Sequence, residues 1–228
     1  MTAARPAPRP PAPAPAPAAA RLSPSLSPVV DPVFDDDVEW SDSALTGSAA
    51  GPTEVAGIEL IGCTLTGLRL TGRVFDRLRL MDVVLDGCDL SGAVVSGGQW
   101  TRVQLLNCRM SGVVLSGLRA QDVTVHGCRA DEAVLRMSHW TSSAFEDSDL
   151  RGADLYDADL TGALLRNCDL TRATFTRARL VGAQLHGSRL DGVLGGEAFR
   201  GVRITGAQVL PLALSVFDDL GIVVEDPA

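Results

Sequence analysis

Four cysteines recur at multiples of twenty residues, and thiols in such a register are the first candidates for chemistry in this sequence. They are Cys88, Cys108, Cys128 and Cys168. A structural zinc site needs four ligands that converge tetrahedrally, typically from paired C-x-x-C segments, and the sequence has no such pair. Thiols on successive turns of a stacked fold would form a line with a spacing of about 4.8 Å. We therefore interpret these cysteines as small core residues and expect no metal and no cofactor.

The histidines are the next candidates, because a histidine could act as a general base. They are His126, His139 and His186. A general base must lie within hydrogen-bond reach of the group that it deprotonates, and no spacing pairs these residues with a serine or cysteine nucleophile. The glycine-rich step at residues 96–98 lacks the lysine and the strand–loop–helix context of a phosphate-binding loop. We therefore expect a protein that is not an enzyme.

The composition excludes several other classes of protein. The chain has 228 residues, 46% hydrophobic and only 4% aromatic, and its net charge of −8 with arginine as the only basic residue argues against nucleic-acid binding. No apolar run approaches the length of about 18 residues that a transmembrane helix needs. The N-terminus has no apolar core of a signal peptide. An odd number of cysteines, five, suits reduced thiols and a cytoplasmic location.

Residues 1–53 differ in composition from the rest of the chain. Eleven of the 13 prolines lie in residues 1–52, and residues 6–17 are rich in alternating proline and alanine, which is typical of a polyproline II segment. Residues 31–42 carry six acidic residues. Such a segment buries little apolar surface, so residues 1–53 are predicted to be a disordered tail. Phe34 and Trp40 lie within the acidic run, either as a docking motif or as part of a solubilising tail.

A repeat of five residues begins near residue 56. Every fifth residue from Leu60 to Leu190 is apolar, at 27 positions without a break. Two residues before each of these positions, 22 of 27 residues are Ala, Ser, Cys, Gly or Val. This period fits neither a helix nor a simple strand. One large and one small inward residue in every five predicts a short flat face followed by a corner.

The stretch at residues 148–162, SDLRGADLYDADLTG, resembles the A(D/N)LXX signature of the pentapeptide-repeat family. The resemblance covers residues 56–209. It implies an all-β fold, a right-handed quadrilateral β-helix in which four repeats make one coil of twenty residues. We assign residues 54–209 to this β-helix.

Two further patterns support a coil of twenty residues without the resemblance. Valine recurs at residues 74, 94, 114 and 134. Trp100 and Trp140 lie forty positions apart with Ala120 midway between them. Two indoles on neighbouring coils would collide in a narrow interior, and a small residue between them relieves the clash.

Residues 210–228 are predicted to form a capping helix and a short tail. The period of five slips by one residue at Gly195 and Gly196, and Phe199, Ile204 and Val209 continue it. Pro211 suits the first helical position, and Gly221 suits the end of the helix. The helix presents an apolar face and, opposite it, a polar face of Ser215, Asp218 and Asp219, while residues 222–224 are candidates for a last strand. The helix either caps the β-helix alone or also forms a homodimer, through Leu212, Val216, Phe217 and Leu220.

Protein binding is the function that remains, and two surfaces are candidates for it. The outward valine column would make a flat, weakly apolar face: Val74, Val94, Val114 and Val134. An acidic belt surrounds roughly one coil: Asp149, Asp154, Asp157 and Asp159. We interpret the chain as a rigid, non-enzymatic protein-interaction scaffold of a bacterial cytoplasm, with no direct nucleic-acid or membrane binding and an unidentified protein partner.

The alternative follows from the family resemblance, because some members imitate DNA. It implies a DNA mimic that binds DNA gyrase or topoisomerase IV and protects against quinolones or a gyrase-targeting toxin. Residues 54–194 hold 17 acidic residues and 15 arginines, a net charge of only −2. Duplex DNA carries one charge per about 1.7 Å of its axis, so the sequence favours the scaffold.

Overall fold

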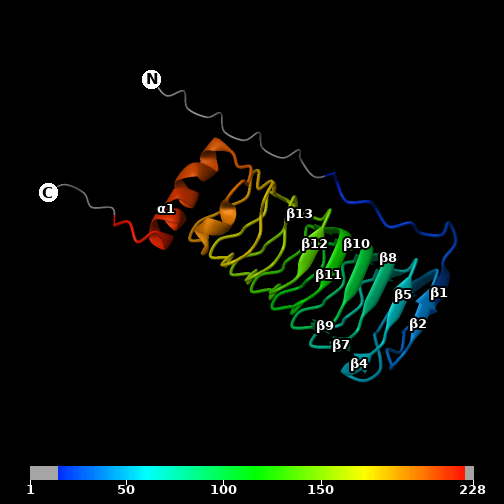
Figure 1. The fold of residues 1–228 in the computed structure, drawn as a ribbon. Helices are drawn as coiled ribbons and strands as arrows, with labels where there is room; N and C mark the ends of the chain where they lie inside the picture. The colour runs from blue at the N-terminus through cyan, green and yellow to red at the C-terminus, as the bar shows by residue number, and fades with distance from the viewer. Residues whose placement is uncertain (1–14, 224–228) are drawn as a thin grey trace.

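The computed structural model describes residues 15–223, which form an elongated solenoid of parallel strands with a helix at its C-terminal end (Figure 1). The repeat is clearest in β8 (Arg79–Asp86), β10 (Gln99–Leu106) and β11 (Arg119–His126). Trp100 pairs with Leu80 on one side and with Ala120 on the other. Each step along the sequence is twenty positions, so the predicted coil length is confirmed.

The strands belong to two sheets that run along the solenoid. One sheet follows the order β1-β3-β6-β8-β10-β11-β13-β14, with β2 paired to β5, β5 also to β8, and β12 to β11. Its other strands are β1 (Ser27–Val30), β2 (Glu39–Ser41), β3 (Ser43–Thr46), β5 (Glu59–Ile61), β6 (Thr64–Thr66), β12 (His139–Thr141), β13 (Ala144–Glu146) and β14 (Leu164–Arg166). The second sheet contains β4 (Glu54–Ala56), β7 (Val74–Asp76) and β9 (Val94–Ser96).

Side chains fill the interior of the solenoid. The large residue and the small residue of each repeat are buried, as Leu155 and Ala153 illustrate. The cysteines of the column predicted from the sequence occupy the small position. Cys108 donates its Sγ hydrogen to the carbonyl oxygen of Leu106 at 3.3 Å, and burial raises the pKa of Cys168 to about 11. The Cys168 thiol is therefore a protonated core group at neutral pH.

The two buried tryptophans of the central column differ in their hydrogen bonds. Ala120 pairs with Trp100 and with Trp140, so the predicted alternation of large and small residues is confirmed. Trp140 donates its Nε1 hydrogen to Ser138 Oγ at 2.7 Å. The residue that corresponds to Ser138 beside Trp100 is Gly98, which has no hydroxyl group to accept a hydrogen bond. Trp100 Nε1 is the one buried side-chain nitrogen or oxygen in residues 15–223 that has no partner.

The first coil begins at Ser27, within the segment that the composition predicts to be a disordered tail. β1 pairs with β3, and Phe34 is 1% exposed, with ring centroids 5.1 Å from Trp40 and 6.1 Å from Phe75. The prediction of disorder is wrong for residues 27–53, because these apolar side chains continue the interior while the acidic ones point outward. Residues 15–26 are described without helix or strand, and residues 1–14 lie outside the described part of the chain.

A buried arginine closes the N-terminal end of the interior. Arg73 occupies a small-residue position and is 8% exposed. Its guanidinium donates hydrogen bonds to the carbonyl oxygens of Pro52 at 2.6 Å and of Ala49 and Ala50 at 3.0 Å. It also lies 5.4 Å from the ring centroid of Phe34. Arg73 therefore hydrogen-bonds three carbonyl groups at the end of the solenoid, and the Ala50 oxygen among them also accepts from the Phe34 nitrogen.

The C-terminal end leaves the five-residue period at Gly195, as the sequence predicts. Gly195 has φ +87°, and a Cβ atom there would lie 2.4 Å from the Thr176 nitrogen, so glycine is required. The chain continues through the short 3₁₀ helices η1 (Gly196–Phe199) and η2 (Gly206–Gln208) into α1 (Val209–Asp219). Phe199 is buried against Phe175, so this continuation of the core is confirmed.

Four expectations for the C-terminal region are wrong. Val209 does not continue the five-residue ladder, because it is the exposed first residue of the helix, and Pro211 is the third helical residue instead of the first. Ser215 faces inward, because its Oγ donates to the carbonyl oxygen of Val193. Residues 222 and 223 form no strand, and residue 224 lies outside the described part of the chain.

Polar side chains attach α1 to the last coil. Gln208 donates its Nε2 hydrogens to the carbonyl oxygens of Leu185 and Ser188, the latter at 2.7 Å. Asp219 accepts a hydrogen bond from the Gly196 nitrogen. Both ends of the interior are thus closed by a buried polar side chain that binds carbonyl groups of the terminal coil, Arg73 at one end and Gln208 at the other.

Candidate interaction surfaces

The valine strip, defined as Val74, Val94, Val114 and Val134, runs along the second sheet. Val74 and Val94 pair within β7 and β9, and single bridges extend the register to Val114 and Val134. Each of these side chains is half-buried. Residues 90–101 and 110–118 contain no charged residue. The middle of the strip is therefore a flat, uncharged surface of valine, serine and glycine.

The four residues of the predicted acidic belt lie within one coil, and each has an arginine beside it. Arg136 Nε lies 2.6 Å from Asp154 Oδ2, and Arg151 Nη2 lies 2.7 Å from Asp149 Oδ2. The longer pairs are Arg177–Asp157 at 3.8 Å and Arg179–Asp159 at 4.0 Å. The belt is therefore a set of ion pairs and not a surface of unpaired carboxylates.

Several ion pairs join an acidic residue to the arginine that lies directly above it, one coil later in the sequence. The bonded pair Asp82–Arg102 is the shortest, at 2.6 Å, and four others lie between 3.5 and 4.0 Å: Glu146–Arg166, Asp157–Arg177, Asp159–Arg179 and Asp169–Arg189. The constant offset of twenty positions between acid and arginine is visible in the sequence and would have revealed these pairs.

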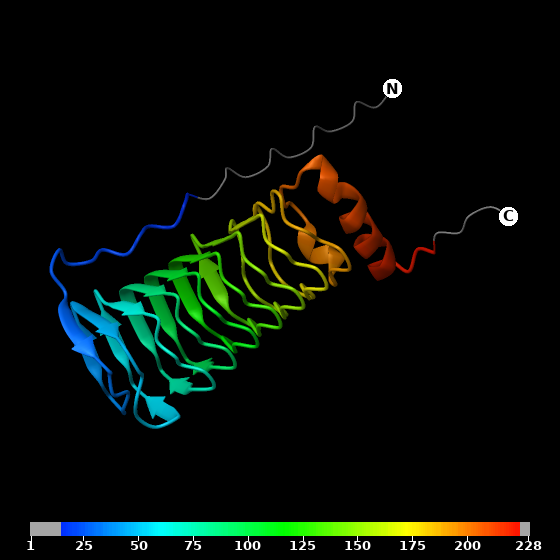
Figure 2. The same cartoon turned by 180° about the vertical axis from the view of Figure 1, so that it is seen from behind.

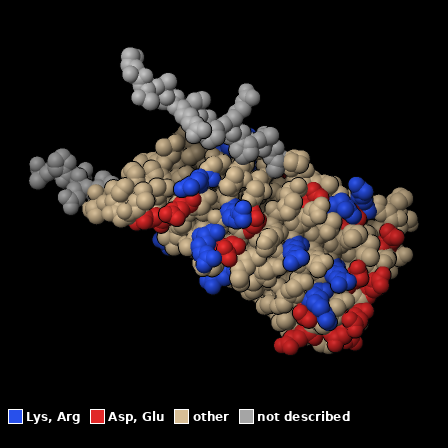
Figure 3. Space-filling model, viewed as in Figure 1, with Lys and Arg blue, Asp and Glu red and all other residues tan. Residues whose placement is uncertain are grey.

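The net negative charge is confined to the first coils. Residues 22–68 hold eight acidic residues and no arginine, whereas the rest of the chain holds 20 of each. In Figure 3 acidic side chains gather at the end of the solenoid formed by β1, β2 and β4, while both signs alternate over the remaining coils. The charge on a strand edge also opposes edge-to-edge pairing with other chains.

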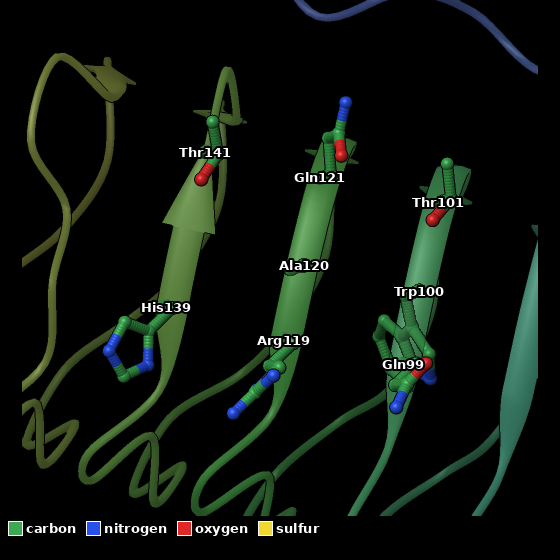
Figure 4. A pocket seen from close by; sticks show the side chains of 8 residues that line it. All are labelled: Gln99, Trp100, Thr101, Arg119, Ala120, Gln121, His139 and Thr141. Carbon is green, nitrogen blue, oxygen red and sulfur yellow. The ribbon is translucent and has the colours of Figure 1, made fainter.

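An open depression crosses β10, β11 and β12 (Figure 4). Gln99, Arg119 and His139 are the first residues of the three strands, and Thr101, Gln121 and Thr141 lie two residues further along them. His139 has no cysteine or serine nucleophile among these neighbours. Across residues 15–223, no group of three His, Cys, Asp or Glu side chains is arranged to hold a metal ion.

The outer surface of α1 is apolar. Leu210 is 68% exposed and Leu214 is 50% exposed, one turn apart on the side away from the solenoid. Of the residues predicted for this cap, Leu212 and Val216 are half-buried and line a pocket with Phe199 and with Leu220, which is itself exposed. Phe217 is half-buried. The inward face therefore caps the solenoid, and the outward face is formed by residues that the sequence pattern did not single out.

The comparison with protein families identifies the repeat. Residues 98–175 match the family model described as a pentapeptide repeat region. This chain carries a pentapeptide-repeat region. The pentapeptide repeats occupy the central coils, and the same register continues on both sides of the matched segment, as the pairs Leu60–Leu80 and Asp169–Arg189 show. A search of curated proteins found no match.

Solved structures of pentapeptide-repeat proteins are similar to this chain. A trypsin-treated variant of QnrB1, a plasmid-mediated fluoroquinolone resistance protein, is 20% identical over 89% of this chain and 98% of its own, with a TM-score of 0.44. HetL, involved in heterocyst differentiation regulation in Nostoc sp. strain PCC 7120, is 17% identical over 72% of this chain and 90% of its own, with a TM-score of 0.23. A thylakoid-lumen protein of Arabidopsis thaliana is 26% identical over 46% of this chain and 78% of its own, with a TM-score of 0.30.

No helix within the described residues is long and apolar enough to cross a membrane.

Proposed function

We propose that this protein is a non-enzymatic scaffold that binds a protein partner through the middle of the valine strip. The observation that carries the proposal is the flat, uncharged surface around Val94 and Val114, on coils that contain no charged residue in this region. Protein interfaces are depleted of charged residues at their centre. The interior is filled by side chains, so the outer faces are where a partner would bind.

The rigidity of the surface favours binding. The strip lies on backbone that pairs with a coil on each side, and parallel strands of this kind position their side chains at a fixed spacing of about 4.8 Å. Little conformational entropy is lost when a partner docks on such a surface. The cytoplasm is the proposed location, supported by five buried cysteines that are all free.

The test is a double substitution, Val94→Arg with Val114→Arg, in the full chain. Both positions are half-buried and outward, so the solenoid accommodates arginine while the strip gains two charges. Val84→Arg with Gln104→Arg is the matched control, because these residues occupy equivalent half-buried positions of neighbouring coils on the other sheet. Proteins captured by the wild type and by the control, and lost with the strip variant, support the proposal. Equal capture by all three contradicts it.

A homodimer through α1 is a second proposal, and it rests on the exposed Leu210 and Leu214. The helices of two copies would bury each other's apolar faces in a two-fold symmetric interface, in which both copies use the same surface. Leu210→Glu with Leu214→Glu should convert a dimer to a monomer in light scattering. Asp218→Lys is a control that changes charge outside this pair of residues. A wild-type chain that is already a monomer, or a dimer that survives the leucine substitutions, contradicts the proposal.

The alternative function is binding to DNA gyrase or topoisomerase IV as a DNA mimic. The acidic first coils favour it, because eight acidic residues without an arginine form one strongly negative end. The ion pairs on the later coils oppose it, because they remove the continuous negative surface that a mimic of duplex DNA requires. We therefore rank it below the scaffold.

A further inference from the structure

An N-terminal segment lies along the outside of the solenoid. Residues 15–26 leave β1 and run beside the coils toward the end that carries α1, as both ribbon views show (Figures 1 and 2). The Ala18 nitrogen donates a hydrogen bond to Asp122 Oδ1 at 3.1 Å, and the Arg21 nitrogen donates one to Asp82 Oδ1 at 2.9 Å. The solenoid therefore holds this segment by its backbone amides.

The exposure of the segment repeats every three residues. Within residues 15–26 every third residue is half-buried and the others are exposed; the half-buried ones are Pro17, Ala20, Ser23 and Leu26. A polyproline II helix has three residues per turn, so one edge of it meets a surface at this interval. The composition of the segment, with Pro15, Pro17 and Pro24, favours that conformation.

The spacing of the two hydrogen bonds matches the spacing of the coils. Three residues of polyproline II advance by about 9.3 Å, at about 3.1 Å each. Asp82 and Asp122 are two coils apart, a distance of about 9.6 Å along the axis. Ala18 and Arg21 are three residues apart, so their amides reach the two carboxylates in register. Pro15 and Pro24 continue the same three-residue series, and neither has an amide hydrogen to donate.

The solenoid holds the accepting carboxylate in place. Arg102, on the coil between the two aspartates, donates from Nε to Asp82 Oδ1 and from Nη2 to Asp82 Oδ2, each at 2.6 Å. Asp82 is only 9% exposed beneath the segment. Asp82, Arg102 and Asp122 all have φ between 54° and 56°, so they occupy the same corner of successive coils. We call these three residues the amide clamp.

We propose that the amide clamp is a binding site for a polyproline II segment, occupied in this chain by its own residues 15–26 and open to a partner's proline-containing segment that displaces them. The recognised feature is a pair of backbone amides three residues apart in an extended segment with small side chains between them. The rise of one polyproline II turn matches the rise of two coils, and this match makes the site selective for polyproline II. A β-strand repeats every two residues, at about 3.3 Å per residue, so it would not present one edge to both carboxylates.

Cleavage by trypsin after Arg21 measures occupancy of the clamp in the full chain, because Arg21 is the only arginine in residues 15–26. Asp82→Gly with Asp122→Gly removes both acceptors, and glycine already stands at the same corner at Gly62, Gly162 and Gly182. Asp147→Gly with Asp157→Gly is the matched control at other left-handed corners. We expect the clamp variant to be cut at least about fivefold faster than the wild type, the effect of losing one hydrogen bond, and the control to be unchanged. Equal rates for the clamp variant and the wild type would overturn the proposal.

A competing peptide tests whether the site accepts a segment in trans. The probe is a synthetic peptide of residues 15–26 with Arg21→Gln, which trypsin does not cut. Adding it in excess should accelerate cleavage after Arg21 of the wild type and leave the clamp variant unaffected. A second peptide with proline in place of Ala18 and Arg21 lacks both amides and should have no effect. Acceleration by both peptides, or by neither, would overturn the inference that a partner's segment can displace the resident one.

Discussion

Asp82 and Arg102 form a bidentate ion pair across one coil, with both oxygen–nitrogen distances at 2.6 Å. The Arg102 hydrogen bond holds the pKa of Asp82 below its usual range. The same relationship of an acid to the arginine one coil later recurs along the solenoid. Charges of this chain therefore compensate one another along the axis, and most of the rod carries little net charge.

The lowered pKa of Asp82 makes its contribution to stability depend on pH. Because its folded pKa is depressed, the stabilisation is present above the unfolded pKa and is lost as the pH falls through the folded value. Asp82→Asn should lower the free energy of unfolding by about 1–3 kcal/mol at neutral pH. The gap between variant and wild type should shrink below pH of about 4. Urea unfolding at both pH values measures it, and a gap that does not change with pH contradicts the assignment.

The hydrogen bond from Trp140 to Ser138 should contribute measurably to stability. Ser138→Ala leaves the Trp140 indole nitrogen without a partner, as Trp100 is beside Gly98, and should cost about 1–2 kcal/mol. Combined with Trp140→Phe, the serine substitution should cost less than it does alone, since no indole hydrogen is then left unpaired. Equilibrium unfolding of the four chains of this cycle gives the coupling energy. A coupling energy of zero would show that the bond is not formed.

Arg73 should be required for the first coil. Arg73→Met keeps the length of the side chain and removes the donors to the carbonyl oxygens of Ala49, Ala50 and Pro52. We expect a loss of about 2–3 kcal/mol, with amide hydrogen exchange rising in residues 27–56 and not in the central coils. Arg77→Met, at an exposed position of the same coil, is the control. Unchanged exchange in the first coil of the Arg73 variant would contradict this role.

Ala120 should not tolerate a large side chain. Ala120→Trp places three indoles in consecutive positions of one column and should cost about 1–3 kcal/mol through overpacking. His139→Trp adds an indole at an exposed position of the next coil and should leave the melting temperature nearly unchanged. Thermal melts of both variants provide the comparison. An Ala120 variant as stable as the wild type would mean that the interior has room for a third indole.

The central coils could be predicted from the sequence because the pattern there is strict. Trp100, Ala120 and Trp140 indicated the register of the coils, and the structure has each in that position. The first coil was missed although Trp40, Leu45, Ala50 and Val55 extend the five-residue series. The proline-rich and acidic composition of residues 1–53 obscured this series. In addition, Ser27 pairs with Ser43, and this spacing is shorter than the twenty residues of a full coil, so the period is interrupted there.

The candidate surfaces could be predicted only in part. The valine strip can be predicted directly from the sequence, because its four valines recur at intervals of twenty residues. The ion pair of Asp157 with Arg177 could be predicted only by searching the charged residues for the same twenty-residue spacing. The amide clamp has no side-chain motif, because Ala18 and Arg21 bind through backbone nitrogens. Only the polyproline II register, compared with the coil spacing, could have indicated it.

Ion pairs between coils leave most of the rod without the continuous negative charge of a DNA mimic. The test of this charge compensation is a DNA gyrase supercoiling assay with the purified full chain, with and without a quinolone. We expect gyrase activity and its inhibition by the drug to stay unchanged at micromolar protein. Inhibition of supercoiling, or rescue from the drug, that is lost when Asp149, Asp157 and Asp159 are replaced by asparagine would contradict it.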